Sequence, residues 1–412
     1  MGLGARLARV PLPRALAHRS FALVWGGQTV SRFGDSLHTI AIAWWVIEET
    51  GSAAALGLVL ACATVPQLVF LLLGGVLVDR FSRLGVMLVA DVVRAVAAGA
   101  VALLAWHGDL AVWHLCALGA VFGTVSAAFF PAYLAAVPDL LPDDALPSAN
   151  SLRFVGSRAA NIAGPALGAA LIAAGGIPLA FALDALSFAV AAVAVAMVGR
   201  DPALHRRAAG EGSVLHDLRA GIGTVAGSPW LWVAIAIAGV SNLTLEGPLA
   251  AVLPALVRET RGEGVRTLAL LNGLSATGAL AAAIWIGRRS RVRRRGPVLY
   301  GAWIAAGLAL AVVGLPLPLV AIGLAMLLLG VGETTLNLIW AQTLQEFVPR
   351  ERLGRVLSID ALGSLSLAPV GYALAGLAAD AVGPARVLVG GGLLSAAIVG
   401  CGLLHPAVRG VD

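Results

Sequence analysis

Long apolar runs alternate with short polar links along nearly the whole chain. An α-helix needs about 20 apolar residues to cross the hydrocarbon core of a bilayer, and the runs have about that length. The pattern therefore predicts an all-α membrane protein with twelve transmembrane helices. The expected spans are residues 21–46, 52–78, 85–106, 110–135, 150–174, 178–198, 229–255, 267–287, 297–315, 318–346, 355–379 and 384–404.

The composition supports a membrane protein. Hydrophobic residues make up 59% of the 412 positions and charged residues 12%, and the mean hydropathy is +0.91. A soluble domain with this composition could not keep a polar surface. We therefore expect a multi-pass protein of the inner (plasma) membrane. The arginine-bearing amino terminus leads straight into a full-length span without a small-residue cleavage site, so no cleavable signal peptide is expected.

Several activities are disfavoured by residue usage. All 28 basic residues are arginine, and a Walker A loop needs its phosphate-binding lysine, so an ATP-driven pump with its own nucleotide site is excluded for this chain. The arginines lie in short loops rather than on one basic face, which argues against a nucleic-acid partner. Cys62, Cys116 and Cys401 lie inside apolar spans without metal-ligand spacing. We expect neither a metal nor a cofactor.

The arginines also predict orientation. If the amino terminus is cytoplasmic, the arginines of four links fall on the cytoplasmic side, as the positive-inside rule requires. The links are residues 79–84, 199–228, 288–296 and 348–355. Both termini are then cytoplasmic.

The chain carries an internal repeat. A constant offset of 207 residues pairs Gly123 with Gly330, Tyr133 with Trp340, and the loop at 142–146 with that at 349–353. The longest polar segment, 200–228, divides the spans six and six. We therefore expect two pseudo-symmetric six-helix bundles. Their predicted ranges are 1–199 and 229–412, with 200–228 as a cytoplasmic linker.

The link after the second span is the most specific motif. Gly75, Asp79, Arg80 and Arg83 follow the spacing Gly-x-x-x-Asp-Arg-x-x-Arg, which resembles the signature loop of the major facilitator superfamily of secondary transporters. Further stretches resemble its drug:proton antiporter branch, which includes macrolide-efflux and enterobactin-exporter proteins. These stretches are 25–35, 91–94, 138–152, 181–188 and 348–356.

The resemblance implies the major facilitator fold, with the substrate site between the two bundles near mid-membrane. It implies export of a small amphipathic molecule, such as a drug, antibiotic or siderophore, by proton antiport and alternating access. The partners would be that substrate, protons and the bilayer, with the protein as a monomer. Gly164, Pro165 and Gly168 resemble the Gly-Pro-x-x-Gly motif of exporters, and the proline should kink the fifth span.

The chain departs from the family in its fourth span, residues 110–135, which lacks the arginine that many drug-proton antiporters carry there. Proton coupling would then need acidic residues elsewhere. In the resembled fold, spans one, four, seven and ten surround the cavity. Asp35, Glu246 and Glu333 lie near the middle of three of them, and they are the predicted proton-coupling residues.

A charge at the bilayer centre costs about 2.5 to 3.5 kcal/mol and so requires a partner, a wet cavity or a function. Arg32 could pair with Asp35 three residues on and keep it ionised, whereas apolar closure would favour its protonated form. The alternative is a permanent salt bridge that only positions the helix. Structural packing remains the alternative for the two glutamates.

Polar and aromatic residues share helix faces with these carboxylates and predict the walls of a substrate cavity. An amphipathic substrate, either neutral or cationic, would suit them. The cavity residues are Gln28, Arg32, His38, Asn161, Asn242, Asn337 and Trp340.

A second predicted group gates the cytoplasmic edge, where Asp79 would contact the opposite bundle beside Arg355. Asp91 and Arg94 would support that latch, whereas Asp184 and Asp360 are interpreted as structural. The gating residues are Gly75, Asp79, Arg80, Arg83, Asp91, Arg94 and Arg355.

Two other functions stay open at this stage. The same fold could serve an importer or an uncoupled facilitator. A membrane-embedded enzyme or receptor is the remote alternative, because the sequence has no convergent Ser/His/Asp set, no His-Glu-x-x-His and no extramembrane domain. We therefore do not expect an enzyme.

Overall fold

The computed structural model describes residues 13–198, 223, 225–261, 264–288 and 294–404. Contacts divide the chain into two compact units. Unit 1 comprises Met1–Trp45 and Cys62–Glu211, and unit 2 comprises Val46–Ala61 and Gly212–Asp412. The boundary after Glu211 falls in the predicted linker 200–228, most of which lies outside the described residues, as do both termini. The predicted division at 199 and 229 and the cytoplasmic termini remain predictions.

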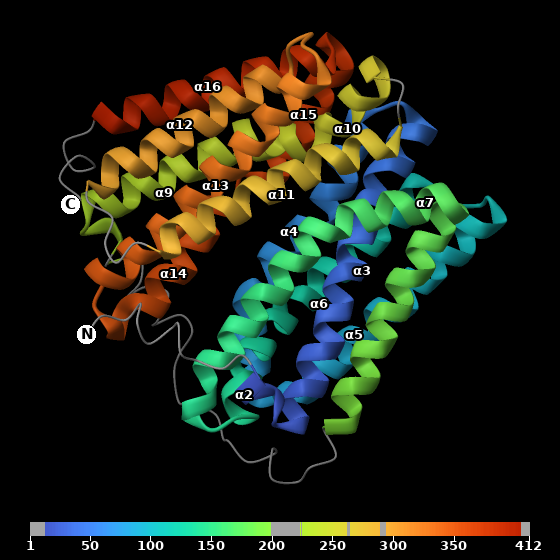
Figure 1. Cartoon of the computed structure of the whole chain (residues 1–412), viewed down its shortest axis with the longest axis vertical. Helices are drawn as coiled ribbons and strands as arrows, with labels where there is room; N and C mark the ends of the chain where they lie inside the picture. Colours follow the sequence, from blue (N-terminus) through green and yellow to red (C-terminus); the bar gives the residue numbers. More distant parts are fainter. Residues whose placement is uncertain (1–12, 199–222, 224, 262–263, 289–293, 405–412) are drawn as a thin grey trace. The chain divides into compact units, whose positions relative to one another are not determined.

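Unit 1 is built from long helices (Figure 1). Both α3 and α4 cross the boundary between the units, because residues 46–61 belong to unit 2. The backbone of α7 leaves helical geometry at Gly176, where φ is 75° and ψ is 179°, so this element forms two spans. The bounds are α2 (Pro13–Leu16), α3 (Arg19–Thr50), α4 (Ala53–Arg80), α5 (Arg83–His107), α6 (Val112–Asp139), η1 (Asp143–Ala145) and α7 (Leu146–Val198).

Unit 2 is also helical throughout its described residues. Its first span is α9 (Pro229–Ser241), which continues through the π-helical turn η3 (Asn242–Glu246) into α10 (Gly247–Arg261). The other elements are α11 (Val265–Gly287), α12 (Arg295–Val313), α13 (Leu319–Phe347), α14 (Arg350–Leu365), α15 (Ala368–Val382) and α16 (Pro384–Leu404).

The predicted spans are confirmed in number and approximate position. Ten helical segments among the described residues are long and apolar enough to cross a membrane. The segment containing α7 counts twice because of Gly176, and α3, which carries several polar residues, completes the twelve predicted spans. The largest shifts are in span seven, where α10 ends at Arg261 rather than residue 255, and in span eleven, where α14 begins at Arg350 rather than residue 355.

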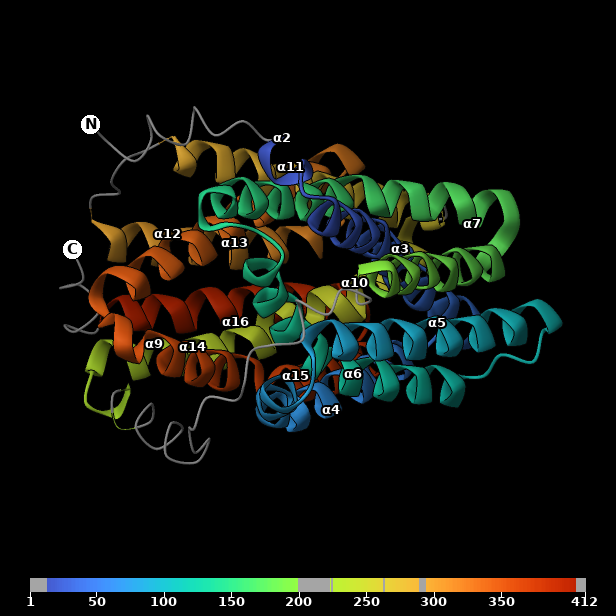
Figure 2. The same ribbon diagram turned by 90° about the horizontal axis from the view of Figure 1, so that it is seen from below.

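Helix α5 turns an apolar face outward. Its exposed stripe is apolar, with Val89, Val96 and Leu103 each 62 to 68% exposed, while Asp91 and Arg94 are buried. Such an arrangement is the reverse of a soluble helix and suits a lipid environment. Helix α6 lies beside α5 within the unit (Figure 2).

The internal repeat is visible in how the helices pack. A Cβ added at Gly123 on α6 would lie 1.9 Å from the Ala63 carbonyl oxygen, and one added at Gly330 on α13 would lie 1.9 Å from the Ser275 carbonyl oxygen. These glycines are the pair that the 207-residue offset predicts. Each lets a neighbouring helix approach to backbone contact, as small residues do between membrane helices.

Candidate functional site

The polar face of α3 is anchored by Gln28, which is 4% exposed and donates through Nε2 to Asp91 Oδ2 at 2.7 Å. Arg32 and Asp35 lie further along this face, and both are partly exposed. No salt bridge joins their side chains in the described part of the chain, although Arg32 lies within electrostatic range of Asp35, and their pairing stays a prediction. Asp35 also lies within electrostatic range of Asp184 and Arg94, which other helices supply.

Asp91 and Arg94 form a charge pair inside unit 1. Arg94 Nη2 donates to Asp91 Oδ1 at 2.9 Å, and the guanidinium lies 4.1 Å from the ring centre of Phe129 and 4.8 Å from that of Phe188. Both charged residues are buried. Their side chains hold helices together within one bundle, and their support of a latch at the cytoplasmic edge stays a prediction.

His38, a predicted cavity residue, is held by α6 and α7. Its ring stacks on Phe122 at 4.8 Å, and its Nδ1 lies 2.9 Å from Asp184 Oδ2. Asn161 on α7 is exposed and belongs to the same unit. Unit 1 therefore brings Gln28, Asp35 and His38 into one polar cluster.

The Gly-Pro-x-x-Gly motif of α7 packs against α3. A Cβ at Gly164 would lie 2.3 Å from Ser36 Cβ, and one at Gly168 would lie 3.5 Å from a Leu37 methyl group. The non-helical backbone inside α7 lies at Gly176 rather than at Pro165. The motif thus sets how closely these two helices approach.

Unit 2 contributes the two predicted glutamates. Glu246 closes the π-helical turn η3, Glu333 lies on α13, and each is partly exposed. Glu333 lies within electrostatic range of Glu246. Asn242 donates through Nδ2 to the Ser364 carbonyl oxygen at 2.8 Å, so this predicted cavity residue ties η3 to α14. A π-helical turn often marks a functional position, and sequence periodicity gave no sign of it.

Trp340 is directed into the bundle of unit 2. Its Nε1 donates to Asp360 Oδ2 at 3.0 Å, and its ring meets that of Trp230 edge to face at 5.9 Å. Asn337, one turn earlier, is exposed.

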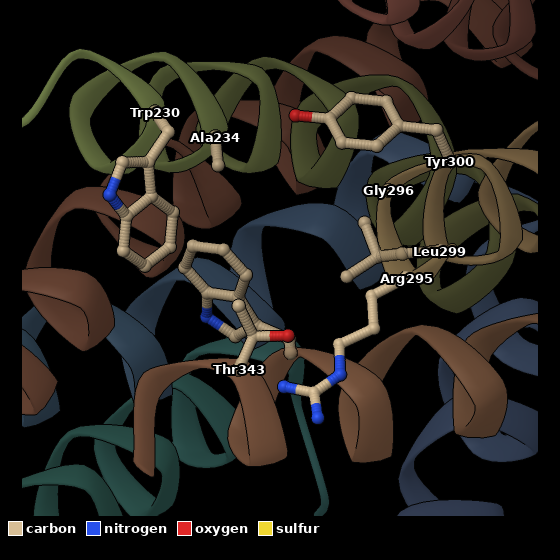
Figure 3. Close-up of a pocket in the computed structure, with 8 residues that line it drawn as sticks. Trp230, Ala234, Arg295, Gly296, Leu299, Tyr300 and Thr343 are labelled. Atoms are coloured by element: carbon tan, nitrogen blue, oxygen red, sulfur yellow. The ribbon is translucent and has the colours of Figure 1, made fainter. Parts of the chain in front are cut away.

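Trp340 also lines a pocket with about 310 Å³ of empty space, a volume that includes its open mouth. Figure 3 shows Trp230 of α9 on one side of this pocket, and Tyr300 and Arg295 of α12 on the other. Buried polar atoms of two of these residues, Tyr300 Oη and Arg295 Nη1, have no hydrogen-bond partner in the described structure.

Arg83 stands alone among the signature-loop residues in having a described side chain. It donates from Nη1 to the Ala135 carbonyl oxygen at 2.9 Å and to Asp139 Oδ2 at 2.6 Å. Unit 2 repeats the arrangement with Arg295, at the start of α12, and Glu346, at the end of α13. Asp139 and Glu346 again differ by 207 positions, so the offset could have predicted this pair. The side chains of Gly75, Asp79, Arg80 and Arg355 lie outside the described part.

Two bundles of apolar spans with polar groups inside each are typical of one class of protein, the membrane transporters. The model of the Major Facilitator Superfamily matches residues 24–371. The chain belongs to this superfamily. It is a multi-pass transporter of the cytoplasmic membrane that handles small molecules, and it is not an enzyme.

Curated relatives match almost end to end. The chain is 25% identical to macrolide efflux protein A of Streptococcus pyogenes, over 95% of this chain and 97% of the relative. It is 30% identical to the multidrug efflux pump Tap of Mycolicibacterium fortuitum, over 85% and 87%. Among solved structures, a POT family transporter superposes with a TM-score of 0.74 at 13% identity, covering 93% of this chain and 95% of that one, which shows the fold alone.

Proposed function

We propose that this protein exports small amphipathic molecules, drugs or antibiotics among them, by proton antiport with alternating access. Efflux is the activity named for relatives that match the chain over most of its length. Protons are a sufficient driving force, because the membrane potential supplies about 2.3 kcal/mol per charge per 100 mV.

One observation carries the proposal. Asp35, Glu246 and Glu333 lie within membrane-spanning helices, and none of them makes an ion pair with a described residue. An unpaired carboxylate inside a membrane is costly when ionised, so it favours either a proton or a cationic substrate. Three such groups could exchange protons for substrate as their surroundings alternate between wet and apolar.

The remaining predicted residues take supporting roles in this proposal. Gln28, Arg32, His38, Asn161, Asn242, Asn337 and Trp340 contact the substrate or hold the carboxylates in place. Gly75, Asp79, Arg80, Arg83 and Arg355 gate the cytoplasmic edge, and the Asp91–Arg94 pair supports that gate. Protons and the substrate are the partners, and a monomer carries out the cycle.

The test uses proteoliposomes and a radiolabelled macrolide under an imposed proton gradient. Asp35→Asn, Glu246→Gln and Glu333→Gln remove the titratable group with little change in shape. We expect each to reduce gradient-driven macrolide transport at least tenfold, which corresponds to about 1.4 kcal/mol.

Asp109→Asn is the matched control, because Asp109 lies in the exposed link after α5; it should transport like the parent protein. Macrolide movement that is unaffected by the gradient and by all three substitutions would contradict the proposal and favour an uncoupled facilitator.

A further inference from the structure

A contact between a histidine and a carboxylate joins α3 to α7 in the described part of unit 1. His38 Nδ1 lies 2.9 Å from Asp184 Oδ2, and the two side chains are 12% and 0% exposed. The residues are 146 positions apart, so the contact follows from the tertiary fold and not from local sequence. His38 Nδ1 makes no hydrogen bond with a described residue, so the two side chains meet as a charge pair whose attraction depends on whether the imidazole is protonated.

The Asp184 carboxylate has no other partner. Both of its oxygens are buried, and neither accepts a hydrogen bond from a described residue. Ser187, one turn later, donates its hydroxyl to the Asp184 main-chain carbonyl at 2.7 Å rather than to the carboxylate. An ionised carboxylate in this state has lost its hydration without replacement, which is unfavourable unless a positive charge or a proton balances it.

Helix α3 encloses the carboxylate from one side. At Gly34, an added Cβ would lie 2.0 Å from Ser187 Oγ and 2.7 Å from Asp184 Oδ1. The glycine therefore lets the backbone of α3 lie directly against the carboxylate. On the histidine side, Phe122 stacks at 4.8 Å and Phe181 meets the ring edge to face at 5.8 Å. Among the described residues, the imidazole is the basic group in direct contact with Asp184.

The pair is not electrically isolated. Two helices supply the charged residues near it, Arg32 and Asp35 on α3 and Asp91 and Arg94 on α5. Helix α6 instead contacts His38 through the uncharged ring of Phe122. Asp35 lies within electrostatic range of Asp184, His38, Arg94 and Arg32. A proton bound at Asp35 therefore changes the field at the pair, and a proton bound at the pair changes the field at Asp35.

We propose that His38 and Asp184 form a proton-binding site inside unit 1, coupled to Asp35 and distinct from the three carboxylates assigned above. Binding adds one proton to a neutral imidazole and an ionised carboxylate, so that it lies on Nδ1 or on Oδ2, and release returns it to water. No bond between heavy atoms forms or breaks. The proposal rests on proton antiport for its purpose, but the site itself can be tested without substrate.

The test is infrared difference spectroscopy of the full chain in liposomes, stepped through pH without substrate. The carboxylic-acid carbonyl band reports protonated carboxyl groups directly. We expect Asp184→Asn to remove one titrating component, and His38→Gln to move the midpoint of that component by about one to three pH units, since a nearby charge shifts a carboxyl group by that amount. Asp109→Asn should leave the component unchanged.

Two results would overturn the proposal. The first is that His38→Gln leaves the titration midpoint of the carboxyl component unchanged. This result can be read even if Asp184→Asn does not fold. The other is a component that depends on sodium at fixed pH, which would assign the site to a metal cation. If the component behaves as expected but a proton gradient does not drive macrolide transport, the site stands and the proposed function fails.

Discussion

Single residues in unit 1 are held by partners that sequence spacing did not reveal. The spacing placed Gln28 and Asp35 on one face of a helix, and the structure places both in one polar cluster. It could not show that Asp91 and Arg94 bind each other inside the bundle, or that Asp184 lies against His38. Periodicity fixes which residues share a face of one helix, whereas these contacts depend on how helices pack.

The Arg94 guanidinium yields a prediction about stability. It is buried, bound to Asp91 and stacked between two phenylalanine rings. Arg94→Met keeps most of the side-chain volume but leaves Asp91 with Gln28 as its remaining partner. Removing one member of a buried ion pair costs about 3 to 5 kcal/mol, so we expect a clearly lower midpoint of thermal unfolding in detergent.

The matched control is Arg386→Met, because Arg386 is exposed and donates only to the Val382 main-chain carbonyl, at the end of the preceding helix α15, at 3.3 Å among the bonds of the described residues. That variant should unfold like the parent protein. Equal unfolding midpoints for the two variants would show that the Arg94 charge pair does not stabilise unit 1.

At the scale of elements, the spans were predictable because bilayer thickness fixes their length. The break at Gly176 and the π-helical turn at 242–246 were not, since both depend on backbone geometry that hydropathy does not record. A third such feature is the amino-terminal end of α4, which is capped by a residue of another helix. Asp380 on α15 accepts from Ala53 N at 2.8 Å and from Ser52 Oγ at 2.5 Å, all within unit 2.

This cap predicts a local effect of Asp380→Ala. The first amides of α4 would lose their acceptor, and loss of an N-cap costs about 0.5 to 2 kcal/mol. Hydrogen exchange followed by mass spectrometry should show faster exchange in a peptide covering residues 52–56, with little change in α5. Asp109→Ala removes an exposed carboxylate elsewhere and should leave that peptide unchanged. Unaltered exchange in Asp380→Ala would mean that α4 starts without help from α15.

At the scale of the whole molecule, duplication is the feature the sequence predicted best. The offset that pairs Gly123 with Gly330 also pairs Asp139 with Glu346. Each of these two carboxylates binds an arginine at the start of a neighbouring helix, Asp139 in unit 1 and Glu346 in unit 2. The carboxylates proposed for coupling do not repeat in this way. Asp35 lies on the first span of the chain, whereas Glu246 and Glu333 lie together in unit 2.

The central claim is that protons and substrate move in opposite directions through one protein. Proteoliposomes that hold a pH-sensitive dye and start without a proton gradient test it most directly, because an added macrolide gradient is then the sole driving force. We predict that macrolide flux in one direction produces proton flux in the other, and that Asp109→Asn retains it while Asp35→Asn loses it. Macrolide flux with no change in internal pH would contradict proton antiport.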